Sequence, residues 1–136
     1  MTIRSARVIF YTAAIFNWVA AVILLPASGL AGHLGARPVG NTLFEQGLLV
    51  AIVVFGIGYW MVGRNPADNR DIVKLGALGK VGLVALAIYH YFLVKDIPFG
   101  TLALGSGDVI YSALFVSHLL SGPRERVSGG AREKAV

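Results

Sequence analysis

The sequence predicts an all-α fold, namely an integral membrane up-down four-helix bundle with both termini in the cytoplasm. Of its 136 residues, 56% are apolar and only 14% are charged, whereas soluble domains average about half apolar and about a quarter charged residues. The apolar residues gather into four stretches near the length of about 20 residues with which a helix crosses a bilayer. The Lys and Arg residues gather on connections that would share one side of the membrane, as in cytoplasmic loops.

The four expected spans are residues 8–25, 43–62, 72–94 and 99–120, and turn-forming residues follow each of them. These are Pro26 and the runs Gly63-Arg64-Asn65-Pro66, Lys95-Asp96-Ile97-Pro98 and Ser121-Gly122-Pro123. An apolar run behind Arg4 and Arg7 also occurs in cleaved signal peptides, but such peptides have only about 7–15 apolar residues. The longer run 8–25 is therefore expected to stay as a helix.

Length and composition also limit the function. One domain is expected, with residues 1–121 forming the transmembrane bundle and residues 122–136 forming a mobile cytoplasmic tail. The chain has no Cys, which excludes a disulfide scaffold and a thiol enzyme. The net charge of +5 comes from the flanks of the spans, so we expect contact with anionic membrane lipids and no nucleic acid partner.

The basic residues predict the orientation. One side of the membrane would carry Arg4, Arg7, Arg64, Arg70, Lys74, Arg124, Arg126, Arg132 and Lys134, and the other side only Arg37 and Lys95. Because Lys and Arg are enriched in cytoplasmic loops, both termini and the connection 63–71 are expected to face the cytoplasm. The chain would then be integral to the plasma membrane.

Small residues are expected to bring the helices together, because leucine gains nothing by leaving lipid for another helix. The third span carries Gly76, Gly79 and Gly82. The short connections predict that the second and third spans lie side by side and that the third and fourth form an antiparallel hairpin. Asn65 or Asn69 is expected to cap the third helix. The Gly-rich connection 26–42 is expected to be flexible rather than to cover the outer mouth of the bundle.

Each span carries a polar residue in the half that would face outward. Asp108 and Asn17 lie roughly 12–13 Å below the outer ends of their helices, and His90 lies roughly 6 Å below, from the helical rise per residue. Glu45 lies near the outer end of the second span. Ionisable residues inside a membrane are costly, so each of them is a candidate for function.

Asp108 is the strongest of these candidates. With Thr101, Gly105 and Ser112 it forms a small and polar stripe at helical spacing, which should face the interior of the bundle. Together with nearby aromatic residues, the polar groups predict a ligand-binding pocket that opens outward. Its expected residues are Asp108, His90, Glu45, Asn17, Trp18, Tyr89, Tyr111 and Ser112.

Simpler roles stay open for the same residues. Glu45 could be solvated at the interface, His90 could belong to an aromatic belt, and Asn17 could only join helices. Asp108 could form a structural ion pair with Lys80, because their Cα levels differ by roughly 7 Å, which a lysine side chain can span. We place this scaffold role ahead of a proton-linked switch.

Other chemistries are disfavoured by the spacing of the residues. His90 and His118 would lie near opposite faces of the membrane, so they could not bind one haem between them. No His-x-x-x-His or Glu-x-x-His spacing supports a metal site, and none is expected. Ser112 and Ser117 lack the neighbouring His and Asp that would indicate a nucleophile.

Three runs of the second and third spans have a familiar pattern, namely Gly56-Ile57-Gly58-Tyr59, Arg64-Asn65-Pro66 and Leu75-Gly76-Ala77-Leu78-Gly79-Lys80. The pattern resembles small bacterial four-span membrane proteins of the DoxX-like kind. The resemblance implies a compact four-helix bundle in the bacterial inner membrane, sometimes accessory to redox enzymes, and it implies no catalytic residue. Small multidrug transporters are similar in length, but Asn17 stands where their first helix carries a glutamate.

Three functions fit these features. The favoured one is a binding or accessory module that holds an apolar small molecule (a lipid, a quinone or a terpenoid-like molecule) in the outer-half pocket. The alternative is a proton- or ion-coupled transporter or channel component, in which Lys80 and Asp108 titrate together within a homo-oligomer or a larger membrane complex. An intramembrane isomerase would instead use Asp108 or Glu45 with His90 for proton transfer. The residues indicate no particular cofactor.

Overall fold

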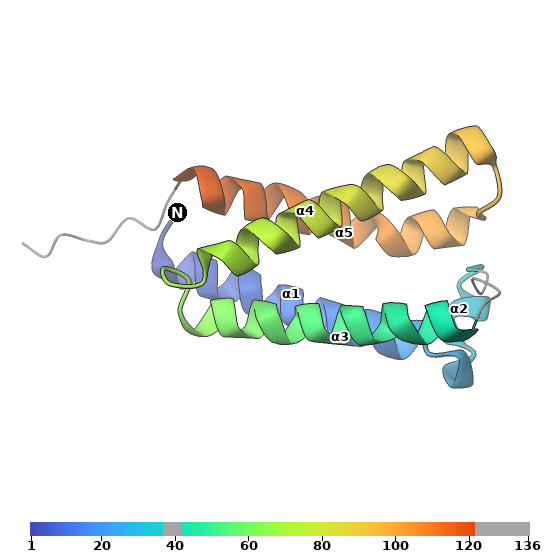
Figure 1. Ribbon diagram of the computed structural model, residues 1–136, viewed down its shortest axis with the longest axis horizontal. Helices are drawn as coiled ribbons and strands as arrows, with labels where there is room; N and C mark the ends of the chain where they lie inside the picture. Colours follow the sequence, from blue (N-terminus) through green and yellow to red (C-terminus); the bar gives the residue numbers. More distant parts are fainter. Residues whose placement is uncertain (37–41, 122–136) are drawn as a thin grey trace, which may run out of the picture.

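The computed structural model describes residues 1–36 and 42–121, and every regular element within them is helical. The four long helices are α1 (Ile3–Leu24), α3 (Thr42–Arg64), α4 (Arg70–Tyr89) and α5 (Phe99–Ser121), as Figure 1 shows. The π-helical stretch η2 (His90–Val94) continues α4. All four helices are long and apolar enough to cross a membrane, which confirms the predicted all-α class. The tail expected at 122–136 lies outside the described residues.

The helices extend beyond the expected spans on their polar flanks. α1 begins at Ile3, where the Ser5 amide donates a hydrogen bond to the Thr2 side chain at 3.1 Å. α4 begins at Arg70, and Asn69 stands at its N-cap position without capping it. The Asn69 side chain instead donates to the carbonyl oxygens of Met61 (3.2 Å) and Asn65 (3.0 Å) at the end of α3. Hydropathy marks only the apolar part of a helix, so it misses such polar ends.

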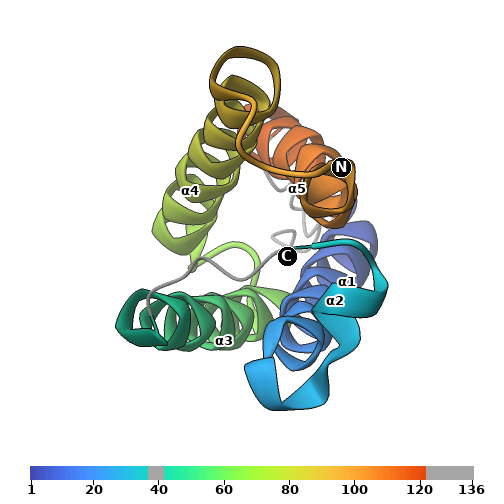
Figure 2. The same cartoon turned by 90° about the vertical axis from the view of Figure 1, so that its right-hand side faces the viewer.

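The long helices form two pairs, α1 with α3 and α4 with α5. Figure 2 shows the two pairs from the end that carries the α4–α5 connection, with α3 and α4 clearly apart. The predicted α4–α5 hairpin is therefore present. The expected side-by-side packing of the second and third spans is wrong over most of their length, because α3 and α4 meet mainly near their connecting turn.

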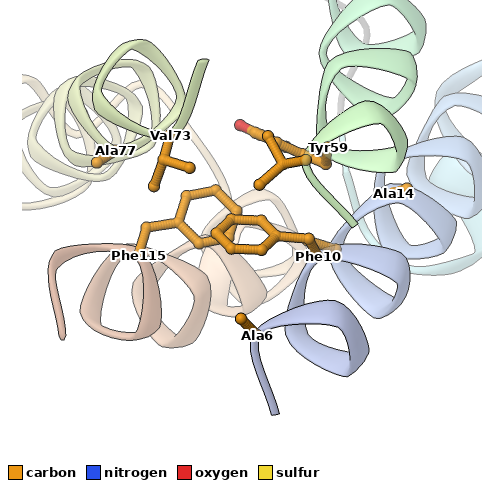
Figure 3. Close-up of a cluster of buried hydrophobic side chains, with 9 residues drawn as sticks. Ala6, Phe10, Ala14, Tyr59, Val73, Ala77 and Phe115 are labelled. Carbon is orange, nitrogen blue, oxygen red and sulfur yellow. The ribbon is translucent and has the colours of Figure 1, made fainter. Parts of the chain in front are cut away.

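Two ends of the bundle can be distinguished (Figure 1). The 65–69 end holds the start of α1, the α3–α4 turn and the end of α5, and the 95–98 end holds the α4–α5 turn and residues 26–36. The buried hydrophobic core lies toward the 65–69 end and takes residues from all four helices (Figure 3). Its members are Ala6, Phe10, Ala13, Ala14, Tyr59, Val62, Val73, Ala77 and Phe115. Phe115 joins the helices, with ring centroids 4.9 Å from both Phe10 and Tyr59.

The described part of the first connection is folded against the 95–98 end. It contains the short helices η1 (Pro26–Ser28) and α2 (Leu30–His33), followed by the buried Ala36. Gly100 at the start of α5 packs so closely on this segment that a Cβ there would lie 2.6 Å from the carbonyl carbon of Gly35. A flexible connection was expected, but glycine at both contact points lets the two backbones meet. Residues 37–41 lie outside the described range.

Candidate functional site

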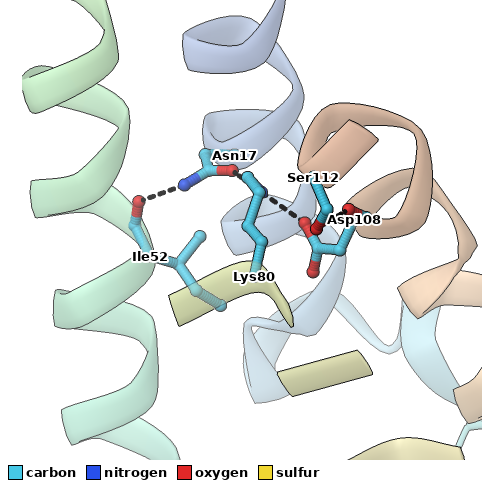
Figure 4. Close-up of polar contacts among 5 residues, drawn as sticks. All are labelled: Asn17, Ile52, Lys80, Asp108 and Ser112. Carbon is cyan, nitrogen blue, oxygen red and sulfur yellow. Dashed lines mark hydrogen bonds and ion pairs between the residues drawn. The ribbon is translucent and has the colours of Figure 1, made fainter. Parts of the chain in front are cut away.

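A cluster of buried polar side chains lies about midway along the helices. Lys80 and Asn17 are each 6% exposed, Asp108 is 8% exposed and Ser112 is 9% exposed. They come from α4, α1 and α5, as Figure 4 shows. Groups of this kind are stable in an apolar interior only when they are paired and hydrogen-bonded.

The contacts of this cluster connect all four long helices. Lys80 Nζ forms an ion pair with Asp108 Oδ1, the partner that the helical rise suggested, and donates to Asn17 Oδ1 at 3.3 Å. Asn17 Nδ2 in turn donates to the Ile52 carbonyl oxygen of α3 at 3.1 Å. Ser112 Oγ donates to the Asp108 carbonyl oxygen at 2.6 Å, which is a bond within α5. The network therefore holds the α1–α3 pair to the α4–α5 pair.

Three aromatic rings surround the ammonium group of Lys80. Its Nζ lies 5.5 Å from the ring centroid of Phe16, 5.4 Å from that of Tyr59 and 5.7 Å from that of Tyr111. The negative faces of aromatic rings stabilise a cation, more strongly where water is absent. The carboxylate, the amide oxygen and the rings together leave Lys80 enclosed within the protein.

A cavity of about 220 Å³ lies between α4 and α5, and Asp108 is one of its wall residues. The exposed surface of the cavity is apolar throughout, and its wall consists of Leu83, Val84, Ala87, Ile88, Leu102, Gly105, Ser106, Asp108 and Val109. Asp108 Oδ1 is engaged by Lys80, and in the described part of the chain no side chain or backbone amide donates to Oδ2. The ion pair therefore adjoins a cavity whose exposed surface is apolar.

The structure brings together only some of the residues predicted to form one pocket. Asn17, Lys80, Asp108, Ser112 and Tyr111 form the buried cluster or adjoin it. The cavity beside them lies between α4 and α5, and not among all four helices as expected.

Trp18 lies at the seam between α1 and α3. Its ring occupies the space that a Cβ on Gly56 would need, its centroid is 5.8 Å from that of Trp60, and its Nε1 donates to the Val53 carbonyl oxygen at 3.4 Å. Consecutive helical residues point about 100° apart, so the neighbour of Asn17 faces a different surface. Trp18 therefore lines neither the buried cluster nor the cavity.

The remaining predicted residues lie at the 95–98 end. His90 Nδ1 pairs with the Asp96 carboxylate at 2.9 Å, and the half-exposed Tyr89 packs its ring edge against His90 at 5.5 Å between centroids. Glu45 lies in the first turn of α3. None of the contacts found among residues 1–36 and 42–121 joins His90 to Asp108. An acid–base pair of these two side chains therefore has no direct contact in this structure.

Phe16 and Tyr59 were missed as neighbours of the polar cluster. The sequence contains one signal that points to them, since a lysine inside a span needs rings or carboxylates around it. The Tyr59 ring packs directly on Gly76 of α4, because a Cβ added to Gly76 would lie 2.5 Å from that ring. Within the described ranges, no three His, Cys, Asp or Glu side chains come close enough together to hold a metal ion.

Comparisons with family models, curated proteins and solved structures find no match to this chain. The apolar cavity beside the Lys80–Asp108 pair is suited to an apolar molecule.

Proposed function

We propose that the chain is a small membrane protein of the DoxX-like kind that crosses the bacterial inner membrane as an up-down bundle with cytoplasmic termini. The charge distribution supports this orientation. Among the Lys and Arg residues that the structure describes, Arg4, Arg7, Arg64, Arg70 and Lys74 lie toward the 65–69 end, and Lys95 lies at the 95–98 end. The positive-inside rule then assigns the 65–69 end to the cytoplasm.

Within this bundle, the α4–α5 cavity is the binding site of an apolar small molecule, and the protein is a binding or accessory module. The observation that carries this function is an apolar cavity of about 220 Å³ whose wall includes Asp108, the buried acidic residue of the ion pair. Intramembrane ionisable residues are retained for a role in a site or a pathway. The volume suits one ring or a segment of a chain, since a cavity of about 150 Å³ already accepts benzene.

A glycine in the cavity wall provides a direct test. A Cβ on Gly105 would meet nothing within 4 Å, so Gly105→Leu fills the cavity without a clash at its first atom. Gly82 of α4 has equally open surroundings and does not line the cavity, so Gly82→Leu is the matched control. Native mass spectrometry of the detergent-purified protein, with extraction of apolar molecules, should find a bound molecule in the unmodified protein and the control only. A molecule retained by Gly105→Leu would contradict the site.

A second pair of variants compares Asp108 and Glu45, the two carboxylates that the sequence predicted for one pocket. Asp108→Asn should reduce binding of the co-purifying molecule more than Glu45→Gln does, because only Asp108 lines the cavity. Binding is measured per folded protein, so that a loss of stability is not counted as a loss of affinity. Equal and negligible effects of both variants would remove the carboxylate from the site.

The buried ion pair also supports a second candidate, a proton- or ion-coupled transporter or channel component. In the single chain, Phe10, Tyr59 and Phe115 pack tightly on the cytoplasmic side of Lys80, which leaves that side of the pair closed. A pathway would therefore need a homo-oligomer or a larger membrane complex. Proton flux into liposomes that hold the purified protein would support this candidate, provided that Asp108→Asn abolishes it.

A further inference from the structure

We propose that the 65–69 end of the α1–α3 seam binds an anionic phospholipid. Its phosphate would contact Arg4, Arg7 and Arg64, and an acyl chain would lie along the aromatic side chains of the seam. This site belongs to a different helix pair from the α4–α5 cavity and does not depend on a ligand there. It requires only that the four long helices cross the membrane, with the 65–69 end at one layer of lipid head groups.

The packing of α1 on α3 brings the three arginines to one end of the seam. The Tyr11 ring packs on Gly63, because a Cβ added to Gly63 would lie 2.7 Å from that ring. The two helices run antiparallel (Figure 1), so Arg7, which precedes Tyr11 by four residues, lies within about one helical turn of the level of Arg64. Arg4 lies about one turn further toward the same end, on the same face of α1.

These three arginines are exposed, and in the described part of the chain none of them has an ion-pair partner. The two carboxylates that the structure describes at this end are engaged by other residues. Asp71 pairs with Lys74 at 2.7 Å, and Asp68 accepts a hydrogen bond from the Asn65 side chain. Three neighbouring guanidinium groups attract a phosphate, whose oxygens arginine binds in a bidentate geometry.

A row of aromatic rings continues the seam from the arginines into the membrane. Trp60 precedes Arg64 by four residues on α3, which places both on one face of the helix, and Trp60 is 42% exposed. The Trp60 ring centroid lies 4.6 Å from that of Tyr11 and 5.8 Å from that of Trp18. Tyr11 and Trp18 each pack on a glycine of α3, which leaves room for their rings. The row provides an apolar surface for an acyl chain directly below the proposed phosphate site.

The basic residues of α4 at the same end have partners within the protein. Arg70 donates to the Leu119 carbonyl oxygen at 2.8 Å, and Lys74 pairs with Asp71. A phosphate beside α4 would have to compete with these contacts. The Lys74 side chain is nevertheless 63% exposed, so a general attraction to an anionic surface would include it as fully as the arginines. Comparison of Lys74 with Arg64 therefore distinguishes a lipid site from a general effect of charge.

Quenching of tryptophan fluorescence by brominated lipids tests the site in the full chain. The sequence has only two tryptophans, Trp18 and Trp60, and both lie on this seam. The vesicles contain phosphatidylglycerol and phosphatidylcholine in equal amounts, with bromine on the acyl chains of one lipid at a time. Both lipids carry a phosphate, but phosphatidylcholine also carries a cation that competes with the arginines. Each basic residue near an anionic lipid surface corresponds to about a fivefold change in affinity. We therefore expect the seam to prefer phosphatidylglycerol by at least about fivefold.

Charge-removing variants locate the preference on the seam. Arg64→Gln should lower it severalfold, and Arg7→Gln/Arg64→Gln should bring it toward one. Lys74→Gln removes the same single charge from the same end of the bundle and should keep the preference. The site would be overturned by equal quenching from the two lipids in the unmodified protein, by a preference that survives the double variant, or by equal losses in Arg64→Gln and Lys74→Gln. All of these outcomes leave the α4–α5 cavity untouched, because its wall contains none of the substituted residues.

Discussion

Two glycines of α4, Gly76 and Gly82, have opposite surroundings. Toward the 65–69 end, Gly76 of α4 receives the ring of Tyr59, and the four helices close around Phe115 (Figure 3). Toward the 95–98 end, Gly82 and Gly105 have nothing within 4 Å of a Cβ position, and α3 and α4 lie apart (Figures 1 and 2). A glycine in a membrane helix therefore indicates either close packing or open space, and only the facing side chain decides which.

The Lys80–Asp108 pair lies where these two regions meet. On one side are the packed rings of the core, and on the other is the cavity of the α4–α5 seam. One end is thus closely packed, and toward the other lies the cavity that we propose as a binding site. This arrangement predicts that substitutions in the packed core and at the pair lower the free energy of unfolding more than substitutions toward the 95–98 end.

The largest effect is expected for Lys80→Met. It leaves Asp108 buried without its partner, and breaking a buried pair in this way costs about 3–5 kcal/mol. The double variant Lys80→Met/Asp108→Asn removes both charges and should recover most of that loss. Both are compared with the unmodified protein by reversible unfolding in mixed detergent micelles. A loss below about 1 kcal/mol for Lys80→Met would show that water reaches the pair.

A smaller effect is expected for two alanine substitutions on α4. At Gly76, the added Cβ would lie 2.5 Å from the Tyr59 ring, so Gly76→Ala overpacks the core and should cost about 1–3 kcal/mol. At Gly82 the Cβ meets nothing within 4 Å, so Gly82→Ala should be neutral or should stabilise the helix by about 0.5–1 kcal/mol. The same unfolding measurement checks both. Equal losses of unfolding free energy in Gly76→Ala and Gly82→Ala would show that the surroundings of the two glycines do not differ in packing.

The arrangement of the helices was only partly predictable from the sequence. Hydropathy located all four spans, because their apolar residues are continuous and their flanks are polar. The divergence of α3 and α4 was not predictable, since a short turn fixes the distance between two helix ends and leaves their crossing angle to side-chain packing. The contact of Gly35 with Gly100 was missed for a related reason, because glycine-rich connections are typical of both flexible and closely packed segments.

The candidate site was likewise predictable only in part. The pairing of Lys80 with Asp108 followed from the helical rise, which sets the depth of a residue in the membrane. The sequence did not determine which helices would enclose the site, because that depends on the rotation of each helix about its axis. Trp18 was placed beside Asp108 on depth alone, yet it faces Gly56 of α3. Tyr89 and His90 were also predicted to lie beside Asp108, although the part of α4 that leads to them lies apart from α3.

The smallest effect is expected at the hydrogen bond between His90 and Asp96, which lies at the 95–98 end. The side chains of His90 and Asp96 are 35% and 50% exposed, whereas those of Lys80 and Asp108 are 7% and 12% exposed. Water and head groups can replace the contact, and exposed pairs contribute about 0.2–1 kcal/mol. His90→Gln and Asp96→Asn should therefore each reduce the unfolding free energy by less than about 1 kcal/mol. A loss as large as that of Lys80→Met would mean that the 95–98 end is as tightly coupled as the core, and the ends would no longer differ.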